Sequence, residues 1–199
     1  RFDGTFRQNQ SSRREVVMFE TIGFLELNSI AKGIETADII LKTAEVNLIF
    51  AKAGCPGKYY ILFTGEVAAV NASIEAGAAA GGEYTVDHCV IPRVHPQVIR
   101  AINLANVPDT QNAVGIMEFF SVTASVYAAD AAVKAAEVDL IDVRLGTGIG
   151  GKSFVVLTGE VAAVREAVSC GVETENAKGM LVSSVVIPNP RKEIFEALL

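Results

Sequence analysis

Two short segments of the sequence carry residue types that can do chemistry. The first, residues 146–153, reads GTGIGGKS and matches the spacing of a phosphate-binding loop, G-x-x-x-x-G-K-[ST]. Such a loop binds phosphate because a strand enters it and a helix leaves it, so that backbone amides and the helix start converge on the anion. Here the following residues, FVVLTG at 154–159, are strand formers that end in a turn. The sequence therefore argues against a nucleotide site at this loop.

The second segment is Gly54-Cys55-Pro56-Gly57, in which a cysteine stands among turn-forming residues. An isolated cysteine is most often a small buried hydrophobe, whereas Pro and Gly neighbours predict an exposed loop. Thiolates are the ligands of iron–sulfur clusters, but a cluster needs several of them and the sequence has no C-x-x-C pattern. One chain cannot assemble a cluster from Cys55 alone.

The remaining cysteines and histidines give weaker signals. His88 and Cys89 are adjacent in the alternating segment YTVDHCVIP, so we expect their side chains on opposite strand faces and Cys89 buried. Cys170 lies near a predicted helix end without a partner in the sequence, and His95 before Pro96 is expected to begin a helix. No Ser/His/Asp triad or carboxylate pair stands out, so we expect no enzyme activity.

The composition narrows the function classes. The chain has 199 residues and a net charge of -6, which argues against a nucleic-acid or anionic-membrane binder. No uncharged apolar run reaches the length of a membrane span, no signal peptide is recognisable, and three cysteines without framework spacing indicate the reducing cytoplasm. Residues 1–17 hold four arginines and two acidic residues, and we interpret them as an N-terminal extension, either a tail or a cloning remnant.

The sequence is an internal duplication. The motif TGEVAAV occurs at residues 64–70 and again at 158–164, and flanking motifs repeat in the same order, with Gly23 aligned on Gly115. The phosphate-loop look-alike is then the second copy of AGCPGKYY, residues 53–60, with two extra residues. Two copies of one structural loop explain its Gly-Lys pair without a nucleotide.

Each copy is predicted as a β-α-β-β-α-β unit with an extra short helix, an α+β arrangement of the ferredoxin-like type. In the first copy the hydrophobic pattern predicts strands at 22–28, 47–53, 59–64 and 84–92, and helices at 31–44, 66–78 and 96–104. Glu26 is expected to face away from the apolar side chains of its strand, and Pro92 to end the last strand. The predicted domains are residues 18–104 and 114–199, joined by a linker at 105–113.

The longest motifs make the chain similar to a known family. They are IGFLELNSIAKGIETADIILKTAEVNL, CPGK, TGEVAAV and CVIPRVHPQVI, and most recur in the second copy. Through them the chain resembles tandem BMC-domain shell proteins of bacterial microcompartments, in particular T-type proteins of propanediol-utilisation compartments, over residues 18–199. The resemblance implies a homotrimer that forms a flat pseudohexagonal tile in the cytoplasm and packs with other shell proteins around metabolic enzymes.

In that family the loop around Cys55 lines a central pore. The resemblance implies that three Cys55 thiolates of a trimer hold one [4Fe–4S] cluster, with one iron left to a non-protein ligand. The second copy has Ile149 at the corresponding place and supplies no ligand. The implied pore loops comprise Gly54, Pro56, Gly57, Lys58, Gly148, Ile149, Gly150 and Gly151. Lys58 is expected either to favour the thiolate form of Cys55 or to be a solvated loop lysine.

The resemblance also concerns two lysines in a D-x-x-x-K pattern. It places Lys42 and Lys134 at the edges of the tile. The alternative is that each lysine is an ordinary surface residue that pairs with Asp38 or Asp130 on its own helix.

Three functions remain in view. The first is a shell tile whose pore cluster carries electrons across the shell to enclosed redox enzymes, or is itself delivered to one of them. The second is a tile with a metal-free pore for small metabolites. The third, an enzyme or nucleotide sensor that uses residues 146–153 on a ferredoxin-like scaffold, is disfavoured by the repeat.

Overall fold

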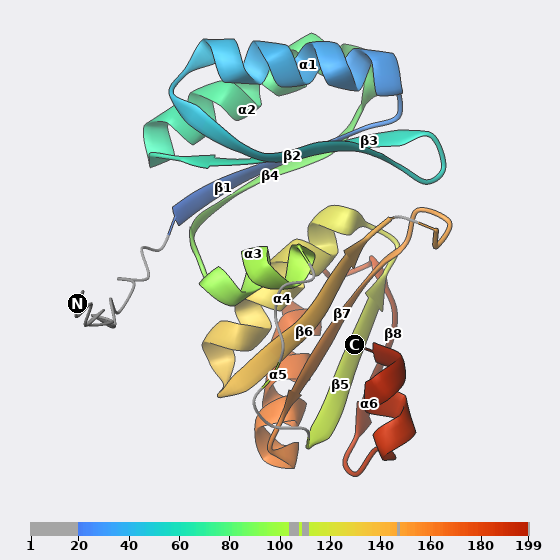
Figure 1. The fold of residues 1–199 in the computed structure, drawn as a ribbon. Helices are drawn as coiled ribbons and strands as arrows, with labels where there is room; N and C mark the ends of the chain where they lie inside the picture. Colours follow the sequence, from blue (N-terminus) through green and yellow to red (C-terminus); the bar gives the residue numbers. More distant parts are fainter. Residues whose placement is uncertain (1–19, 104–107, 109–111, 147, 199) are drawn as a thin grey trace, which may run out of the picture.

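The computed structural model describes residues 20–103, 108, 112–146 and 148–198, which fold as two similar halves (Figure 1). The predicted extension 1–17 and most of the predicted linker lie outside the described residues. The first half consists of β1 (Glu20–Leu27), α1 (Ile30–Thr43), β2 (Val46–Gly54), β3 (Lys58–Gly65), α2 (Val67–Gly81), a 3-10 turn (Gly82–Tyr84), β4 (Thr85–Val94) and α3 (Pro96–Ile102). The second half consists of β5 (Ala113–Phe119), α4 (Val122–Ala135), β6 (Val138–Leu145), β7 (Ser153–Gly159), α5 (Val161–Glu173), β8 (Leu181–Ile187) and α6 (Lys192–Leu198).

Each half is built on a four-stranded antiparallel sheet. The strand orders are β2-β3-β1-β4 and β6-β7-β5-β8, so the first strand of each copy lies between the third and the fourth. This is the order that a ferredoxin-like unit produces, and the predicted α+β duplication is confirmed. The exact domain limits stay a prediction, except that Ala113, assigned to the linker, opens strand β5.

The strand β4 differs from its prediction. It continues through Pro92 to Val94 instead of ending at Pro92. The strand lies at the sheet edge and pairs only with β1, and the pairing is irregular between Glu20 and Ile22, opposite this proline. A proline is tolerated there because its missing N–H removes no bond from the interior of the sheet.

Helices of both copies begin with the same device. Ser29 before α1 accepts a hydrogen bond from the backbone N of Lys32 at 3.3 Å, and Ser121 before α4 accepts one from Ala124 at 3.3 Å. Such N-caps satisfy amides that have no partner inside the helix. In the first half, α1 and α2 then cover one sheet face with a core of Leu25, Leu27, Ile40, Ile61, Phe63, Val70 and Ile74.

The two halves share one continuous core. The other face of the first sheet, with Phe24 and Leu62, packs together with α3 against α4 and β6 of the second half (Figure 1). Gln97 of α3 ties this contact to the edge strand β6, since its side-chain oxygen accepts from the backbone N of Leu140 at 2.7 Å. The buried side chains of α4 that meet this contact include Val122 and Val126.

A glutamate–lysine pair recurs at the start of the third strand of each copy. Lys58 donates to Glu26, and Lys152 donates to Glu118 at 2.5 Å. The expectation that Glu26 faces away from the apolar side chains is wrong, because it lies on the sheet face that the second half covers and is 1% exposed. Burial raises the pKa of Glu26, and the neighbouring Lys58 opposes that shift.

His95 joins the two halves at the start of α3. Its Nδ1 accepts from the backbone N of Gln97 at 3.4 Å, and its own backbone N donates to Asp130 of α4 at 2.8 Å. The prediction that His95 begins a helix is confirmed. Partial burial lowers the pKa of His95, while Asp130 acts in the opposite direction. The cap requires a neutral imidazole, because a protonated Nδ1 cannot accept.

We expect acidification to weaken the fold through His95. Its folded-state pKa lies below the ordinary 6.5, so the unfolded chain binds the proton more tightly, and stability present above pH 6.5 is lost as the pH falls below it. His95→Asn keeps a side-chain acceptor at the cap and does not titrate. The free energy of unfolding, measured with urea between about pH 7.5 and about pH 5.5, should therefore fall less in His95→Asn than in the wild type. His88→Asn, at an exposed histidine, is the control that should leave the wild-type slope unchanged.

The two glutamate–lysine pairs should differ in energy because they differ in burial. Lys58→Met leaves the nearly inaccessible Glu26 carboxylate without its cation and should lower the free energy of unfolding by about 2 to 3 kcal/mol near neutral pH. Lys152→Met removes a pair whose side chains are 41% and 33% exposed, and should cost at most about 1 kcal/mol. Urea denaturation at one fixed protein concentration compares them, and equal losses would contradict the role assigned to burial.

Candidate functional site

The cysteine turn connects β2 to β3 at one end of the first sheet (Figure 1). Gly54 pairs with Lys58, so the connection consists of Cys55, Pro56 and Gly57, with a cis bond before the proline. Cys55 is half-buried, whereas Pro56 and Gly57 are exposed. Gly57 has φ +70°, a conformation that favours glycine, which explains the residue type at this position.

The second copy of the turn is longer and rich in glycine. Left-handed φ values of 61° to 80° occur at Gly146, Gly148, Gly150 and Gly151. The loop is closed by hydrogen bonds from the backbone N of Gly146 to the oxygen of Lys152 at 3.1 Å and from Lys152 N to Ile149 O at 3.3 Å. It leads into strand β7, as its sequence predicts, and not into a helix. Lys152 is bound to Glu118, so the structure provides neither the helix start nor the available lysine that a phosphate loop uses.

The two turns lie against each other. The backbone N of Cys55 donates to the carbonyl of Gly146 at 3.1 Å. Gly151 faces the other side of the cysteine turn, where a Cβ on it would lie 3.0 Å from Cδ of Pro56. One chain therefore brings the predicted loop residues of both copies into a single cluster, although they are far apart in the sequence.

Tyr60 lies at the base of this cluster and was not anticipated from the sequence. Its hydroxyl donates to the carbonyl of Cys55 at 3.4 Å. Burial raises the pKa of Tyr60, and the negative charges of Glu26 and Cys55 raise it further, so the hydroxyl keeps its proton. The available signal was strand alternation, which places Tyr60 and Lys58 on the same sheet face.

Lys58 is not the solvated loop lysine of one expectation, and its influence on the Cys55 thiolate stays a prediction. Its ammonium is bound to Glu26, in a pair with little solvent access, instead of standing free in solvent. The same pairing of Lys152 with Glu118 shows that this lysine anchors the third strand of each copy to the first. The pair fixes where the cysteine turn begins.

The other cysteines lie elsewhere. Cys89 is buried under the second half, and burial, followed by the charge of Asp87, raises its pKa to about 12, while the adjacent His88 is exposed. Cys170 on α5 donates from Sγ to Glu166 at 3.4 Å. Within the part of the chain that the structure describes, no three His, Cys, Asp or Glu side chains are grouped to hold a metal ion.

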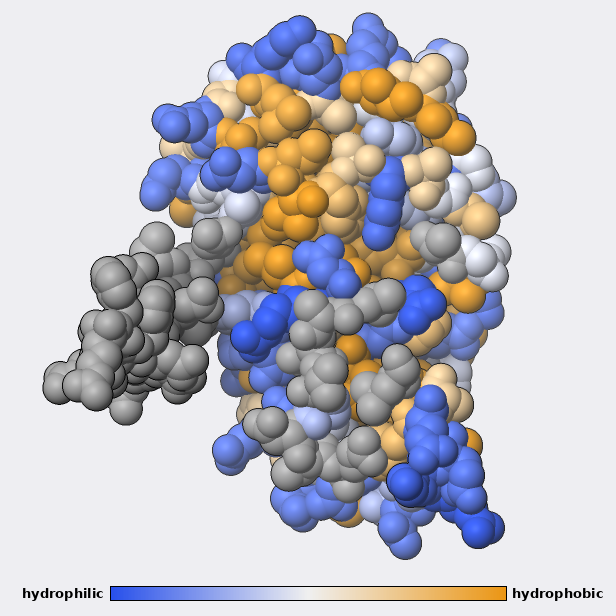
Figure 2. Space-filling view, in the orientation of Figure 1, coloured by the Kyte–Doolittle hydropathy of each residue, from blue (hydrophilic) through white to orange (hydrophobic). Residues whose placement is uncertain are grey.

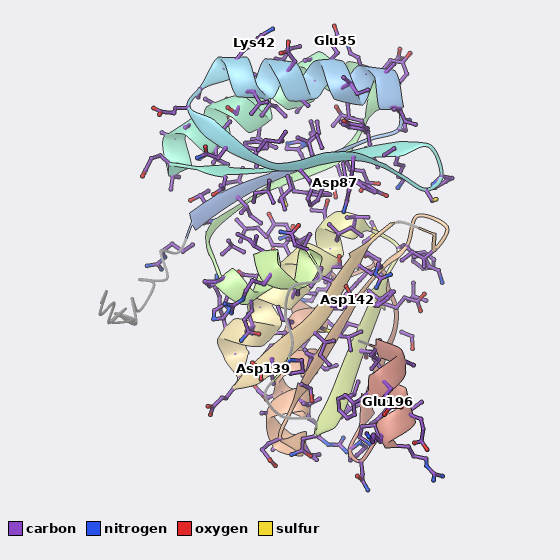
Figure 3. All side chains as sticks on the ribbon, viewed as in Figure 1. Glu35, Lys42, Asp87, Asp139, Asp142 and Glu196 are labelled. Atoms are coloured by element: carbon purple, nitrogen blue, oxygen red, sulfur yellow. The ribbon has the colours of Figure 1, made fainter. Side chains whose placement is uncertain are left out.

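The two lysines of the D-x-x-x-K pattern pair within their own helices. Lys42 binds Asp38 at 2.5 Å on the exposed side of α1, where Figure 3 shows it directed away from the sheet. Lys134 binds Asp130 at 2.6 Å, and this largely buried aspartate also accepts from the backbone N of His95. These are the intrahelical pairs of the alternative interpretation, and the role at tile edges stays a prediction.

Among the helices of residues 20–103 and 112–198 that the structure describes, none has both the length and the apolar character to span a bilayer.

Comparisons with known proteins place this architecture in a family. The BMC domain model matches residues 21–94 and 113–190, which are the two halves. The chain is 43% identical over 182 residues to the bacterial microcompartment shell protein PduT of Citrobacter freundii, covering 92% of this chain and 99% of that protein. It is 40% identical over 83 residues to the shell protein PduA of the same organism, covering 40% of this chain and 87% of that protein.

A solved structure agrees with the sequence relatives. A microcompartment protein from Desulfitobacterium hafniense superposes with a TM-score of 0.84 at 48% identity, covering 90% of this chain and 99% of that chain. Both sequence relatives are bacterial microcompartment shell proteins. The duplicated sheet-and-helix unit and these likenesses together show that the chain belongs to the BMC-domain family and is a shell protein of bacterial microcompartments.

Proposed function

We propose that the chain forms a homotrimeric, pseudohexagonal shell tile whose central pore binds one [4Fe–4S] cluster through Cys55 of three chains. The observation that carries the trimer is a pair of unfilled surfaces. Each surface is equivalent, through the internal repeat, to a surface that is buried between the two halves of one chain. Other shell proteins pack around such a tile.

The first unfilled surface is on the first half and is called here the helix-side surface. Its filled equivalent in the second half consists of α4 and β6, where Val126 is fully buried under the first sheet. The residue of α1 that aligns with Val126 is Ile34, and it is 56% exposed. The same contrast holds at three more aligned pairs: Ile30 with Val122, Leu41 with Val133, and Leu48 with Leu140, with the first member exposed each time. Figure 2 shows apolar surface exposed across the upper part of the molecule, which is the first half.

The second unfilled surface is on the second half and is called the sheet-side surface. Its filled equivalent is the face of the first sheet with α3, where Val98 is fully buried. The aligned residue of α6 is Ile194, which is 45% exposed. On the edge strands, Val185 is likewise exposed where the aligned Cys89 is buried. The sheet-side surface of one chain therefore has the character that fits the helix-side surface of another.

These two surfaces make a head-to-tail contact. A contact between unlike surfaces repeats from chain to chain until the rotation closes a ring. A ring of three chains contains six copies of the domain, which is the pseudohexagon that the family resemblance implies. Association also covers Ile, Leu and Val side chains that are about half exposed, so each contributes roughly half of the 1.5 to 3 kcal/mol that full burial gives.

The donor set at the turns suits an iron–sulfur cluster. Cys55 is half-buried on a turn whose outer residues, Pro56 and Gly57, are exposed, so its thiol is within reach of a neighbouring chain's group. Thiolates are the usual ligands of a [4Fe–4S] cluster. The second copy places Ile149 in its turn and adds no competing ligand. In a ring of three chains the cysteine turns alternate with the glycine-rich loops, and three thiolates face the axis.

Such a cluster supplies reversible single-electron transfer when it is bound. The chain's own residues hold the ligand in place: the Gly146 carbonyl binds the backbone N of Cys55, and the Glu26–Lys58 pair fixes the start of β3. A half-exposed ligand is compatible with electron transfer to enclosed redox enzymes and with delivery of the cluster to one of them. A pore without metal, for small metabolites, is the alternative that the second experiment below separates.

Ile34→Glu should prevent ring formation. The substitution places a carboxylate at the centre of the helix-side surface, where association would bury it among apolar side chains, and should weaken association by roughly a hundredfold or more. Sedimentation velocity of the wild type should show trimers, and the variant should show single chains. The control is Met180→Glu. Its aligned residue in the first half, Tyr84, stays exposed although the second half covers the sheet-side face there. Met180, which is equally exposed, should therefore also stay exposed when a neighbouring chain covers the sheet-side surface. Dissociation of both variants, or of neither, contradicts the assigned surface.

Cys55→Ser should abolish cluster binding without affecting assembly. Anaerobic reconstitution with iron and sulfide should give a brown wild-type trimer with about one four-iron cluster per three chains, detected by iron analysis, visible absorption and EPR. Cys170→Ser is the control and should retain the cluster. A trimer of wild type that stays colourless rejects the cluster and leaves a tile with a metal-free pore. A cluster that persists in Cys55→Ser assigns it to other ligands.

A further inference from the structure

We infer that Tyr60 is the positioning residue of the cysteine turn, because its hydroxyl and ring tie Cys55 of the first copy to the glycine-rich loop of the second. The inference builds on the proposed function, in which the direction of the Cys55 thiol decides whether three chains can share one ligand. Its local part, the restraint of the turn by Tyr60, is testable without any metal.

The ring of Tyr60 fills the space between two equivalent glycines. A Cβ added to Gly54 would overlap the ring carbons, and one added to Gly146 would overlap the hydroxyl. These glycines align with each other in the repeat and stand at the two ends of the hydrogen-bonded contact between the turns. The absence of a side chain at both positions lets the ring touch both backbones at once. The ring is held from behind by Phe24, whose centroid is 6.0 Å away in a stacked arrangement.

The hydroxyl is present in the copy that has the cysteine. The residue of the second copy that aligns with Tyr60 is Phe154, which lies half-buried with the Arg144 guanidinium 5.8 Å from its ring centroid. An aromatic ring is thus common to both copies, and the glutamate–lysine pair is common as well. The oxygen of Tyr60 and the sulfur of Cys55 are both absent from the second copy.

The peptide groups on both sides of Cys55 are hydrogen-bonded within this cluster of loop residues. The amide N of Cys55 donates to the Gly146 carbonyl at 3.1 Å, and the carbonyl of Cys55 accepts from the Tyr60 hydroxyl at 3.4 Å. With both groups fixed, the Cα–Cβ bond of Cys55 has one direction relative to the second half of the chain. Removing the hydroxyl leaves the amide contact in place and frees the carbonyl, so the turn can rotate about its remaining tie.

The test compares Tyr60→Phe with Tyr59→Phe in the trimeric, metal-free protein. Tyr59 is the neighbouring buried tyrosine on the opposite sheet face, against Gly33, so its substitution removes one hydroxyl without touching the turn. Hydrogen exchange followed by mass spectrometry reports the amides of Gly54, Cys55, Gly57 and Lys58, since Pro56 has none. Loss of one hydrogen bond should speed exchange there by about fivefold in Tyr60→Phe, with the other strands unchanged. Tyr59→Phe should exchange at the wild-type rate in this segment.

The second readout uses the reconstituted protein. Tyr60→Phe should still bind iron and sulfide but lose the visible absorption in air several-fold faster than Tyr59→Phe, because a ligand that moves is more easily released. Unchanged exchange at residues 54–58 overturns the inference, whether or not the wild type binds a cluster. Faster exchange spread over all strands also overturns it, since it shows general destabilisation. Faster local exchange in a protein that binds no cluster supports the restraint by Tyr60 and rejects the proposed function alone.

Discussion

The packing of the first sheet and α3 on α4 and β6 is the contact on which the rest of the molecule depends. A four-stranded sheet with two helices on one face leaves its other face apolar, and one short helix covers that face incompletely. In the first copy this apolar face packs on α4 of the second copy, where Val122 and Val126 are fully buried. Each chain has one such contact between its halves. The helix-side surface of the first half, with Ile34, and the sheet-side surface of the second half, with Ile194, therefore remain exposed. Tandem duplication therefore covers one pair of these surfaces within the chain and leaves the other pair for contacts between chains.

The same contact determines the geometry of the candidate site. Because the second half packs beneath the first sheet, Gly146 arrives next to Cys55 and Tyr60, and the backbones of the two turns form a hydrogen bond. Glu26 is buried by this packing and holds Lys58, so the ion pair lies where the turn joins its strand. The cysteine is therefore placed by the second copy as much as by the strands on either side of it. A change in the inter-copy contact would be felt at the turn.

The sequence predicted the strands and helices well, but it did not predict which side chains are buried between the copies or form ion pairs there. Repeated motifs and hydrophobic periodicity located the strands and helices of both copies, and the Pro and Gly neighbours of Cys55 indicated a turn. The burial of Glu26 was missed because alternation along one strand shows two faces but not that the second face would be covered by another copy. The pairing of Lys58 with Glu26 was missed for the same reason, since the two residues are distant in the sequence. Pro92 suggested a strand end, but an edge strand accommodates it and β4 continues to Val94.

The difference between the two turns has a consequence for symmetry. A ring of six identical domains must present the same residue at every turn, so a cysteine at that position would appear six times around the axis. A duplicated gene releases this constraint, because each copy can evolve separately while the outline of the ring is preserved. Here one copy has Cys55 and the other has Ile149 in a longer, glycine-rich loop. Threefold chemistry can thus be placed inside a sixfold outline, and a tile of this kind can fit a hexagonal lattice while its centre has a composition that a single-domain protein could not reach.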